Sequence, residues 1–386
     1  LKNDEGEFVC PDCKRPVQKA GGEENWFFKL SEFQEPLLKF YEENPDFIRP
    51  ETRKNEIVSF VKSGLKDLSI SRSTFDWGVP LPFDEGHVAY VWADALLAYF
   101  TGIGYGSEER AGEFEQRWPM QYHFVGKDIT RFHCVIWPAM LMAAGLPVTH
   151  TVFGHGFLLT KGEKMSKSKG NALKPADLVK VFGVDAYRYY FLSDVQFGHD
   201  GSISIERMVQ VYNADLANTW GNLCSRVFNM TKKYFEGKVP SAPASASENP
   251  LREIADELYA EYDKCMGQVD FTNAAAAVQK LASRVNLYVE DSAPWNLAKS
   301  EETADELAAV IYNALEAIRI IALYMAPFMP NTSAEVFNRL GLGDIFAIID
   351  IEAATVWGQL EAGSAVAVGD PLYPRLDADA IDLSIE

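Results

Sequence analysis

The chain has 386 residues, of which 47% are hydrophobic and 24% charged, and its formal net charge at pH 7 is −19. This length and balance are typical of a soluble globular protein with two or three domains and a well-buried core. No run of 18 apolar residues is present, so the sequence predicts no membrane span. The acidic charge excludes indiscriminate attraction to nucleic-acid phosphates, so any RNA contact must come from local patches.

The five cysteines do not form the pattern of a secreted disulfide framework, since only Cys10 and Cys13 lie close together. This predicts a reducing, cytoplasmic location. The first residue is Leu1 rather than Met, in a Gly/Glu-rich stretch without a signal-peptide pattern. We therefore expect the sequence to start inside a longer protein.

Residues 23–204 alternate apolar strands with amphipathic helices, which predicts an α/β domain with a helix-covered sheet. Gln121–Gly126 is expected to be a buried strand, and Asp128 to cap a helix that runs towards Gly145. Thr149–Gly154 is expected to be the next strand. Further expected elements are the apolar segment Phe157–Thr160 and short helices over Pro175–Phe182 and Asp185–Leu192.

From about Ile205 onward the strand pattern gives way to helical spacing, which predicts an antiparallel helix bundle over residues 205–340. Residues 341–386 are expected to form a mixed tail, irregular around Pro371–Pro374. The expected helices are Ser204–Phe235, Leu251–Val269, Thr272–Asp291, Glu302–Met325 and Ser333–Leu340.

A lysine-rich loop, Lys161–Lys169, gives a local charge of +3 in this acidic chain because it holds four lysines and one glutamate. Ammonium groups beside small hydroxyl residues suit a triphosphate, whose charge moves onto pyrophosphate during reaction. A solvated surface loop is the alternative. The loop follows a predicted strand that ends near His155 and Gly156, and open α/β sheets bind nucleotides at such strand ends.

A second nucleotide motif is the strand end Phe124–Asp128. Gly126 allows a ligand to approach the backbone, and Asp128 can accept hydrogen bonds from ribose hydroxyls. A simple helix cap is the alternative for Asp128.

Together these motifs resemble class I aminoacyl-tRNA synthetases, in which Lys-Met-Ser-Lys-Ser, here Lys164–Ser168, is a family signature. The resemblance spans nearly the whole chain and is closest to the enzymes for methionine. Its other landmarks are Ser69–Arg72, Trp77–Pro80, Tyr90–Ala95, Gly126–Asp128, Trp137–Ala139 and His155–Phe157.

The resemblance implies ATP-dependent attachment of L-methionine to tRNA(Met) through methionyl-adenylate, with Mg·ATP as a substrate. It also implies a class I, Rossmann-like catalytic domain followed by a helical anticodon-binding domain. Lys164 and Lys167 would be catalytic. The implied ATP-binding residues are Gly126, Asp128, His155, Gly156, Leu158 and Lys167.

The resemblance also assigns an amino-acid pocket to two helix faces. Their spacing places Trp92, Ala95, Leu96 and Tyr99 on one face and Ile129 and His133 on another. A thioether suits an aromatic-rich wall, since sulfur–ring contacts contribute about 0.3–1.5 kcal/mol each. Plain core packing is the alternative for both stripes.

For the anticodon, the family resemblance implies contacts from Asn222, Arg226 and Trp295. An indole stacks on an unpaired base, while Asn and Arg bond to base edges. A helix-surface pair and a core tryptophan are the alternative.

Cys10 and Cys13 form half of a four-ligand zinc knuckle, and we expect Zn²⁺ in the intact protein rather than in this chain alone. Residues 1–22 are then the remnant of an inserted subdomain. The second class I motif, His-Ile-Gly-His, is not in the sequence, so we expect the chain by itself to be inactive. The alternatives are a class I enzyme for Leu, Ile, Val or Cys, or a non-catalytic tRNA-binding fragment.

Overall fold

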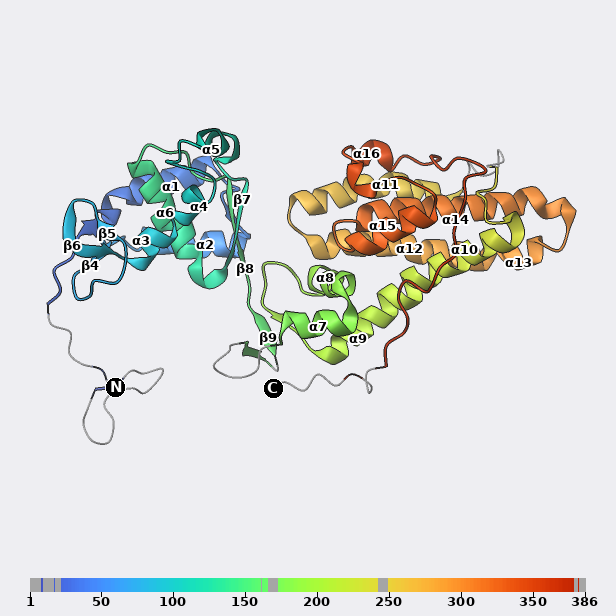
Figure 1. Cartoon of the computed structure of the whole chain (residues 1–386), viewed down its shortest axis with the longest axis horizontal. Coiled ribbons are helices and arrows are strands. Elements are labelled where there is room, and N and C mark those ends of the chain that lie inside the picture. The colour runs from blue at the N-terminus through green and yellow to red at the C-terminus, as the bar shows by residue number, and fades with distance from the viewer. Residues whose placement is uncertain are drawn as a thin grey trace. The chain divides into compact units, whose positions relative to one another are not determined.

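The computed structural model describes residues 8–9, 17, 22–160, 162–165, 173–241, 249–377 and 381. The chain separates into two compact units, Leu1–His155 and Gly156–Glu386, and each is described by itself (Figure 1). The division therefore falls before the lysine loop, whereas the sequence indicated a change from α/β to helical structure near residue 205. The segment between these two positions belongs to the second unit.

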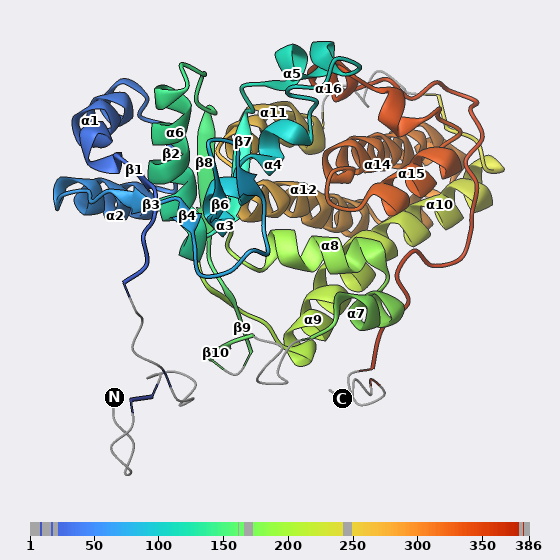
Figure 2. The same cartoon turned by 60° about the vertical axis from the view of Figure 1, so that its left-hand side comes forward.

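The first unit is built around a three-stranded parallel sheet in the order β2-β8-β7. β7 (Tyr122–Gly126) and β8 (Thr151–His155) confirm the two strands predicted for this region. The third strand, β2 (Ile48–Arg49), pairs with β8. α2 (Glu51–Lys62) and α6 (Trp137–Ala143) lie beside this sheet in Figure 2, and α1 (Gln34–Glu43) packs against α2.

Two small antiparallel sheets complete the strands described in the first unit. β6 (Asp84–Ala89) pairs with β4 (Ser71–Arg72) and β5 (Pro80–Leu81), and β1 (Phe27–Phe28) pairs with β3 (Leu68–Ser69). Three short helices follow β6: α3 (Val91–Ala95), α4 (Ala98–Thr101) and α5 (Ala111–Arg117).

The helical segment after β7 is less regular than predicted. It begins as a 3-10 turn over Lys127–Ile129, continues as a π-helix over Phe132–Ile136 and ends as α6. The prediction that Asp128 caps this segment is wrong, because Gly126 occupies the N-cap position and Asp128 lies inside the first turn. The side chain of Asp128 therefore projects from the turn itself.

A proline explains the irregular middle of this segment. Pro138 has no N–H, so it cannot donate to the carbonyl of Cys134 four residues earlier. The hydroxyl of Tyr41 donates to that carbonyl instead, at 2.6 Å. Tyr41 is buried, and burial raises the pKa of its hydroxyl, which keeps it protonated as a donor.

The second unit begins with a small sheet in which β9 (Leu158–Thr160) pairs with β10 (Glu163–Lys164) and β11 (Gly201–Ser202). Two helices between these strands confirm the prediction, α7 (Pro175–Phe182) and α8 (Val184–Ser193).

The helix bundle predicted after residue 205 is confirmed. The long helix predicted over Ser204–Phe235 is continuous in position but changes type, because a ten-residue π-helix, Tyr212–Gly221, separates its two α-helical parts. The α-helices described from residue 205 onward are α9 (Ile205–Val211), α10 (Asn222–Phe235), α11 (Pro250–Gly267), α12 (Phe271–Ser292), α13 (Pro294–Leu297), α14 (Ala304–Met325), α15 (Pro330–Arg339) and α16 (Ile351–Ala354).

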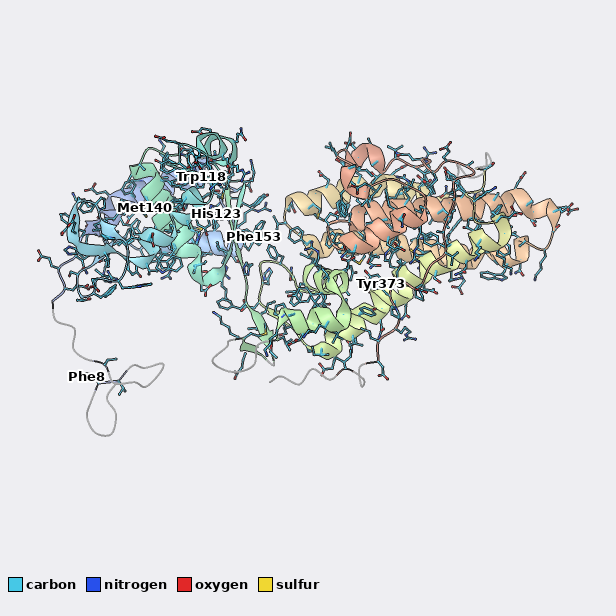
Figure 3. The ribbon with its side chains drawn as sticks, in the orientation of Figure 1. Phe8, Trp118, His123, Met140, Phe153 and Tyr373 are labelled. Carbon is cyan, nitrogen blue, oxygen red and sulfur yellow. The ribbon has the colours of Figure 1, made fainter. Side chains whose placement is uncertain are left out.

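α14 is the core helix of this bundle, since every residue from Ala309 to Met325 is buried. The stretch Glu301–Met325 is long and apolar enough to span a membrane, but its apolar window is 94% buried inside the protein. This burial is the property of a core helix. The segment after the bundle packs against it through buried Leu360, Val366 and Tyr373, the last of which is labelled in Figure 3.

Candidate functional site

Tyr99 and His133 are joined by a hydrogen bond, although they lie 34 residues apart in the chain. The hydroxyl of Tyr99, on α4, lies 2.8 Å from Nε2 of His133, on the π-helix. The second ring nitrogen, Nδ1, lies 3.0 Å from the carbonyl oxygen of Ile129. Three of the residues predicted to bind the amino acid are thus brought together in one chain of contacts.

The chemistry of these partners determines the tautomer of His133. A carbonyl oxygen can only accept, so Nδ1 carries the proton and donates it to Ile129. Burial lowers the pKa of His133, so the ring is neutral at pH 7 and its Nε2 is an acceptor. The Tyr99 hydroxyl therefore donates to Nε2, and its oxygen keeps a lone pair for another group.

The other predicted pocket residues differ in environment. Trp92 is half-buried and stacks on Phe132, with ring centroids 3.9 Å apart. Leu96 is buried in the core of the first unit, whereas Ala95 is exposed. Leu96 and Leu97, between α3 and α4, keep helical dihedral angles, so the single helix face expected from Trp92 to Tyr99 stays a prediction.

The predicted nucleotide residues of the first unit lie at the carboxyl ends of neighbouring parallel strands. Gly126 of β7 pairs directly with His155 of β8. A Cβ atom at Gly126 would lie 2.7 Å from the Asp128 carboxylate oxygen, so a larger residue there would displace the Asp128 side chain. Asp128 is exposed, and this strand-end edge is where open α/β sheets bind ligands.

The remaining described nucleotide residues belong to the second unit. Gly156 runs so close to the backbone of His199 and Asp200 that a Cβ there would meet the His199 carbonyl at 2.2 Å. Leu158 is half-buried in β9, and Lys164 is exposed in β10 with its Nζ 3.5 Å from the centre of the Phe157 ring. This contact places the ammonium group of Lys164 next to Phe157, the residue that precedes β9.

Other predicted residues cannot be placed. Lys167, Cys10 and Cys13 lie outside the described residues. Within the described ranges no group of three or more His, Cys, Asp or Glu residues is arranged to hold a metal ion. The half-knuckle for zinc therefore stays a prediction.

The predicted anticodon residues lie at the surface of the second unit. Asn222 is exposed and Arg226 is half-exposed, one turn apart at the start of α10. Trp295 lies in α13, and 42% of its surface is exposed. The alternative of a core tryptophan does not fit this exposure, because a core indole would be covered.

Two residues that the motifs did not indicate support these sites. The carboxylate of Asp200 accepts a hydrogen bond from the backbone N–H of Phe157 at 2.8 Å, which holds the entry to β9. His123 is buried in β7 beside Tyr99, with ring centroids 4.3 Å apart. The strand alternation could have indicated that His123 faces inward with Val125, because residues two apart share a face.

The fold and these strand-end residues define a class I aminoacyl-tRNA synthetase catalytic fold followed by a helical domain. A family model described as tRNA synthetases class I (M) matches residues 6–228, and one described as the anticodon binding domain of methionyl tRNA ligase matches residues 239–383. The chain therefore belongs to the methionyl-tRNA synthetase family of class I.

Individual relatives agree with this assignment. The chain is 47% identical to the methionine--tRNA ligases of Caldanaerobacter subterraneus subsp. tengcongensis and Streptomyces coelicolor, over 98% of its own length. It spans 58% and 72% of those two relatives, respectively. A solved structure of the Mycobacterium tuberculosis methionyl-tRNA synthetase in complex with methionyl-adenylate is 39% identical, with a TM-score of 0.87, over 96% of this chain and 72% of that one.

Proposed function

We propose that this chain provides amino-acid, nucleotide and anticodon contacts of a cytoplasmic enzyme that attaches L-methionine to tRNA(Met). The observation that carries the proposal is the Tyr99–His133–Ile129 chain of hydrogen bonds beside the stacked Trp92. Family membership supports it, as does the methionyl-adenylate in the related structure.

The hydrogen-bonding state of this wall favours a thioether. The Nδ1–H of His133 is given to Ile129 and the hydroxyl proton of Tyr99 is given to His133. A substrate carbonyl would find no free donor from this pair and would lose its water without compensation. The sulfur of methionine is only a weak acceptor, so it loses little there and gains contacts with the rings.

The proposed reaction has two steps. The methionine carboxylate oxygen attacks the α-phosphorus of Mg·ATP, and the bond to the β-phosphate oxygen breaks, giving methionyl-adenylate and pyrophosphate. A terminal ribose hydroxyl of the tRNA then attacks the methionyl carbonyl, and AMP leaves. Such a reaction rests on positioning and charge stabilisation rather than on a covalent enzyme intermediate.

Each unit has a proposed part in the first step. Asp128 at the end of β7 accepts hydrogen bonds from ribose hydroxyls, as its exposed carboxylate allows. Lys164 and Lys167 stabilise the negative charge that develops on pyrophosphate. Cys10 and Cys13 contribute two thiolates to a zinc site of the intact protein.

The test is methionine-dependent pyrophosphate exchange by the chain joined to a relative's segment that carries the His-Ile-Gly-His motif. Trp92→Ala and His133→Ala should each raise the methionine KM by about tenfold or more and leave the ATP KM nearly unchanged, because an apolar contact in a pocket is worth about 1–3 kcal/mol. His150→Ala, at an exposed histidine of the same unit, is the matched control. Normal methionine kinetics in both pocket variants would refute the assignment.

A further inference from the structure

His123 is a buried histidine on the inward face of β7, three residues before Gly126. Its side chain is 4% exposed. Its ring meets the ring of Tyr99 edge to face, with centroids 4.3 Å apart and planes at 86°. Its ring centroid also lies 6.4 Å from that of Trp118, with the planes at 78°, and Figure 3 labels His123 and Trp118 in the first unit.

The polar atoms of His123 do not explain its position. Its Nε2 is buried and has no hydrogen-bond partner among the residues that the structure describes. Burial, with a smaller contribution from His133, lowers the pKa of His123 to about 4, so the ring is neutral at pH 7. What His123 offers its neighbours is therefore a flat, uncharged ring fixed to a strand.

The His123 ring packs against the ring of Tyr99, so it can fix the position of the tyrosine hydroxyl. Tyr99 is half-buried on α4, which follows α3 through two residues in helical conformation. His123 contacts Tyr99 and also lies 5.8 Å from the ring of His133. His123 is thus a strand residue whose ring lies beside both partners of the Tyr99–His133 hydrogen bond.

We propose that His123 is a positioning residue: its ring holds Tyr99 so that the tyrosine hydroxyl donates to Nε2 of His133. This inference rests on the proposed function in so far as the Tyr99–His133 pair lines the methionine site. In that role His123 links methionine recognition to the strand that ends at the proposed nucleotide site. It does not itself need to touch the substrate.

The first test needs no activity and uses the chain as it is. The ¹⁵N resonance of His133 Nε2 reports whether that nitrogen accepts a hydrogen bond, and Tyr99→Phe gives the reference value without the donor. His123→Ala should shift this resonance to the Tyr99→Phe value. His123→Phe, which keeps the edge-to-face contact, should keep the wild-type value, and the exposed-site control His150→Ala should do the same.

Two results of this test would overturn the proposal. One is an unchanged Nε2 resonance in a folded His123→Ala variant, which would mean that Tyr99 holds its place unaided. The other is a His123→Phe variant that behaves like His123→Ala, which would mean that ring packing is not the cause.

The second test measures kinetics in the chain completed with the His-Ile-Gly-His segment. His123→Ala should raise the methionine KM about three- to tenfold, the size of one aromatic pair, and leave the ATP KM within about twofold. The double variant His123→Ala/Tyr99→Phe should be no worse than the poorer single variant, because both changes remove one hydrogen bond. Additive effects, or equal changes in both KM values, would contradict the proposal.

The two tests separate the inference from the proposed function. If the completed wild-type enzyme shows no methionine-dependent exchange, the proposed function fails. The Nε2 resonance still decides whether His123 positions Tyr99.

Discussion

The Glu316–Arg319 pair of the second unit and the Tyr99–His133 pair of the first are both polar contacts among apolar neighbours, but their atoms are bonded to different extents. Glu316 and Arg319 lie on α14, with side chains 0% and 4% exposed. The Glu316 carboxylate accepts from Arg319 and from the backbone N–H groups of residues 358–360. The Arg319 guanidinium also donates to the carbonyls of residues 354 and 356.

The aromatic cluster around Tyr99 keeps unused polar atoms. Nε2 of His123 and Nε1 of Trp137 are buried, and within the described part of the chain neither has a hydrogen-bond partner. Tyr99 itself is half-buried and gives its single proton to His133. The polar groups here are neutral, and only part of their bonding capacity is used.

The two sites differ because a buried charge needs its hydrogen-bond partners more than a buried neutral group does. A charged pair is tolerated in a core only when almost every donor and acceptor is satisfied, as at Glu316 and Arg319. That network fixes the segment 354–360 on α14. Unsatisfied neutral groups cost less, and among the described residues they occur in both units, for example at Nε1 of Trp137 in the first and at Nε1 of Trp220 and the hydroxyl of Tyr324 in the second.

The largest effect is expected from a substitution that disrupts the hydrogen-bond network of Glu316 and Arg319. Glu316→Gln should lower the free energy of unfolding of the second unit by about 3–5 kcal/mol, because it leaves the Arg319 guanidinium buried without its counter-charge. Urea denaturation with signals from the second unit measures this change. Glu306→Gln, at an exposed position on the same helix, is the matched control and should cost less than about 1 kcal/mol. Similar losses in the two variants would show that the network contributes no more than a surface charge.

The next effect concerns pH and the first unit. The pKa of His123 is about 4 in the folded protein against 6.5 for a free histidine. The unfolded chain therefore binds more protons between these values, and stability falls as the pH drops below 6.5. From pH 7.5 to pH 5 the expected loss from this one group is about 2 kcal/mol.

Comparison with His123→Phe isolates that loss. The unfolding free energy of the first unit is measured at pH 7.5 and pH 5 in both proteins, so that all other titrating groups cancel. The wild type should lose about 2 kcal/mol more than the variant. Equal losses of unfolding free energy in the two proteins would mean that the pKa of His123 is not lowered by folding. Water would then reach His123 more readily than its 4% exposure indicates.

The sequence predicted those parts of the fold that depend on periodicity. The apolar runs of β7 and β8 and the helical spacing of α7 and α14 were sufficient, because such patterns report burial directly. The π-helices were not predictable from spacing. One of them is explained by Pro138, which has no N–H to donate to the Cys134 carbonyl. The hydroxyl of Tyr41, 93 residues earlier in the chain, donates to that carbonyl instead.

The candidate site shows the same limit. Its motifs identified Tyr99 and His133, but the hydrogen bond between them depends on tertiary packing of a four-residue helix against a π-helix. His123 carries no motif and was missed. Leu96 had the right spacing for the pocket but is buried in the core of the first unit. Spacing gives the helix face on which a residue lies, but not how deeply tertiary packing buries it.

A third expected effect concerns Trp295, a residue at the surface of the second unit. With a net charge of −19 the protein cannot rely on general attraction to phosphates, so RNA recognition must come from a few placed contacts. The half-exposed indole of Trp295 can stack on an unpaired base. Trp295→Ala should weaken tRNA aminoacylation by about tenfold or more, since a stacked base is worth roughly 1–3 kcal/mol. Methionine-dependent pyrophosphate exchange involves no tRNA and should stay nearly unchanged in the same variant.

The control is Phe346→Ala, another exposed aromatic of the second unit, which should spare both half-reactions. Equal damage to the two half-reactions of Trp295→Ala would identify the indole as a packing residue, and the proposed anticodon surface would then lose its stacking platform.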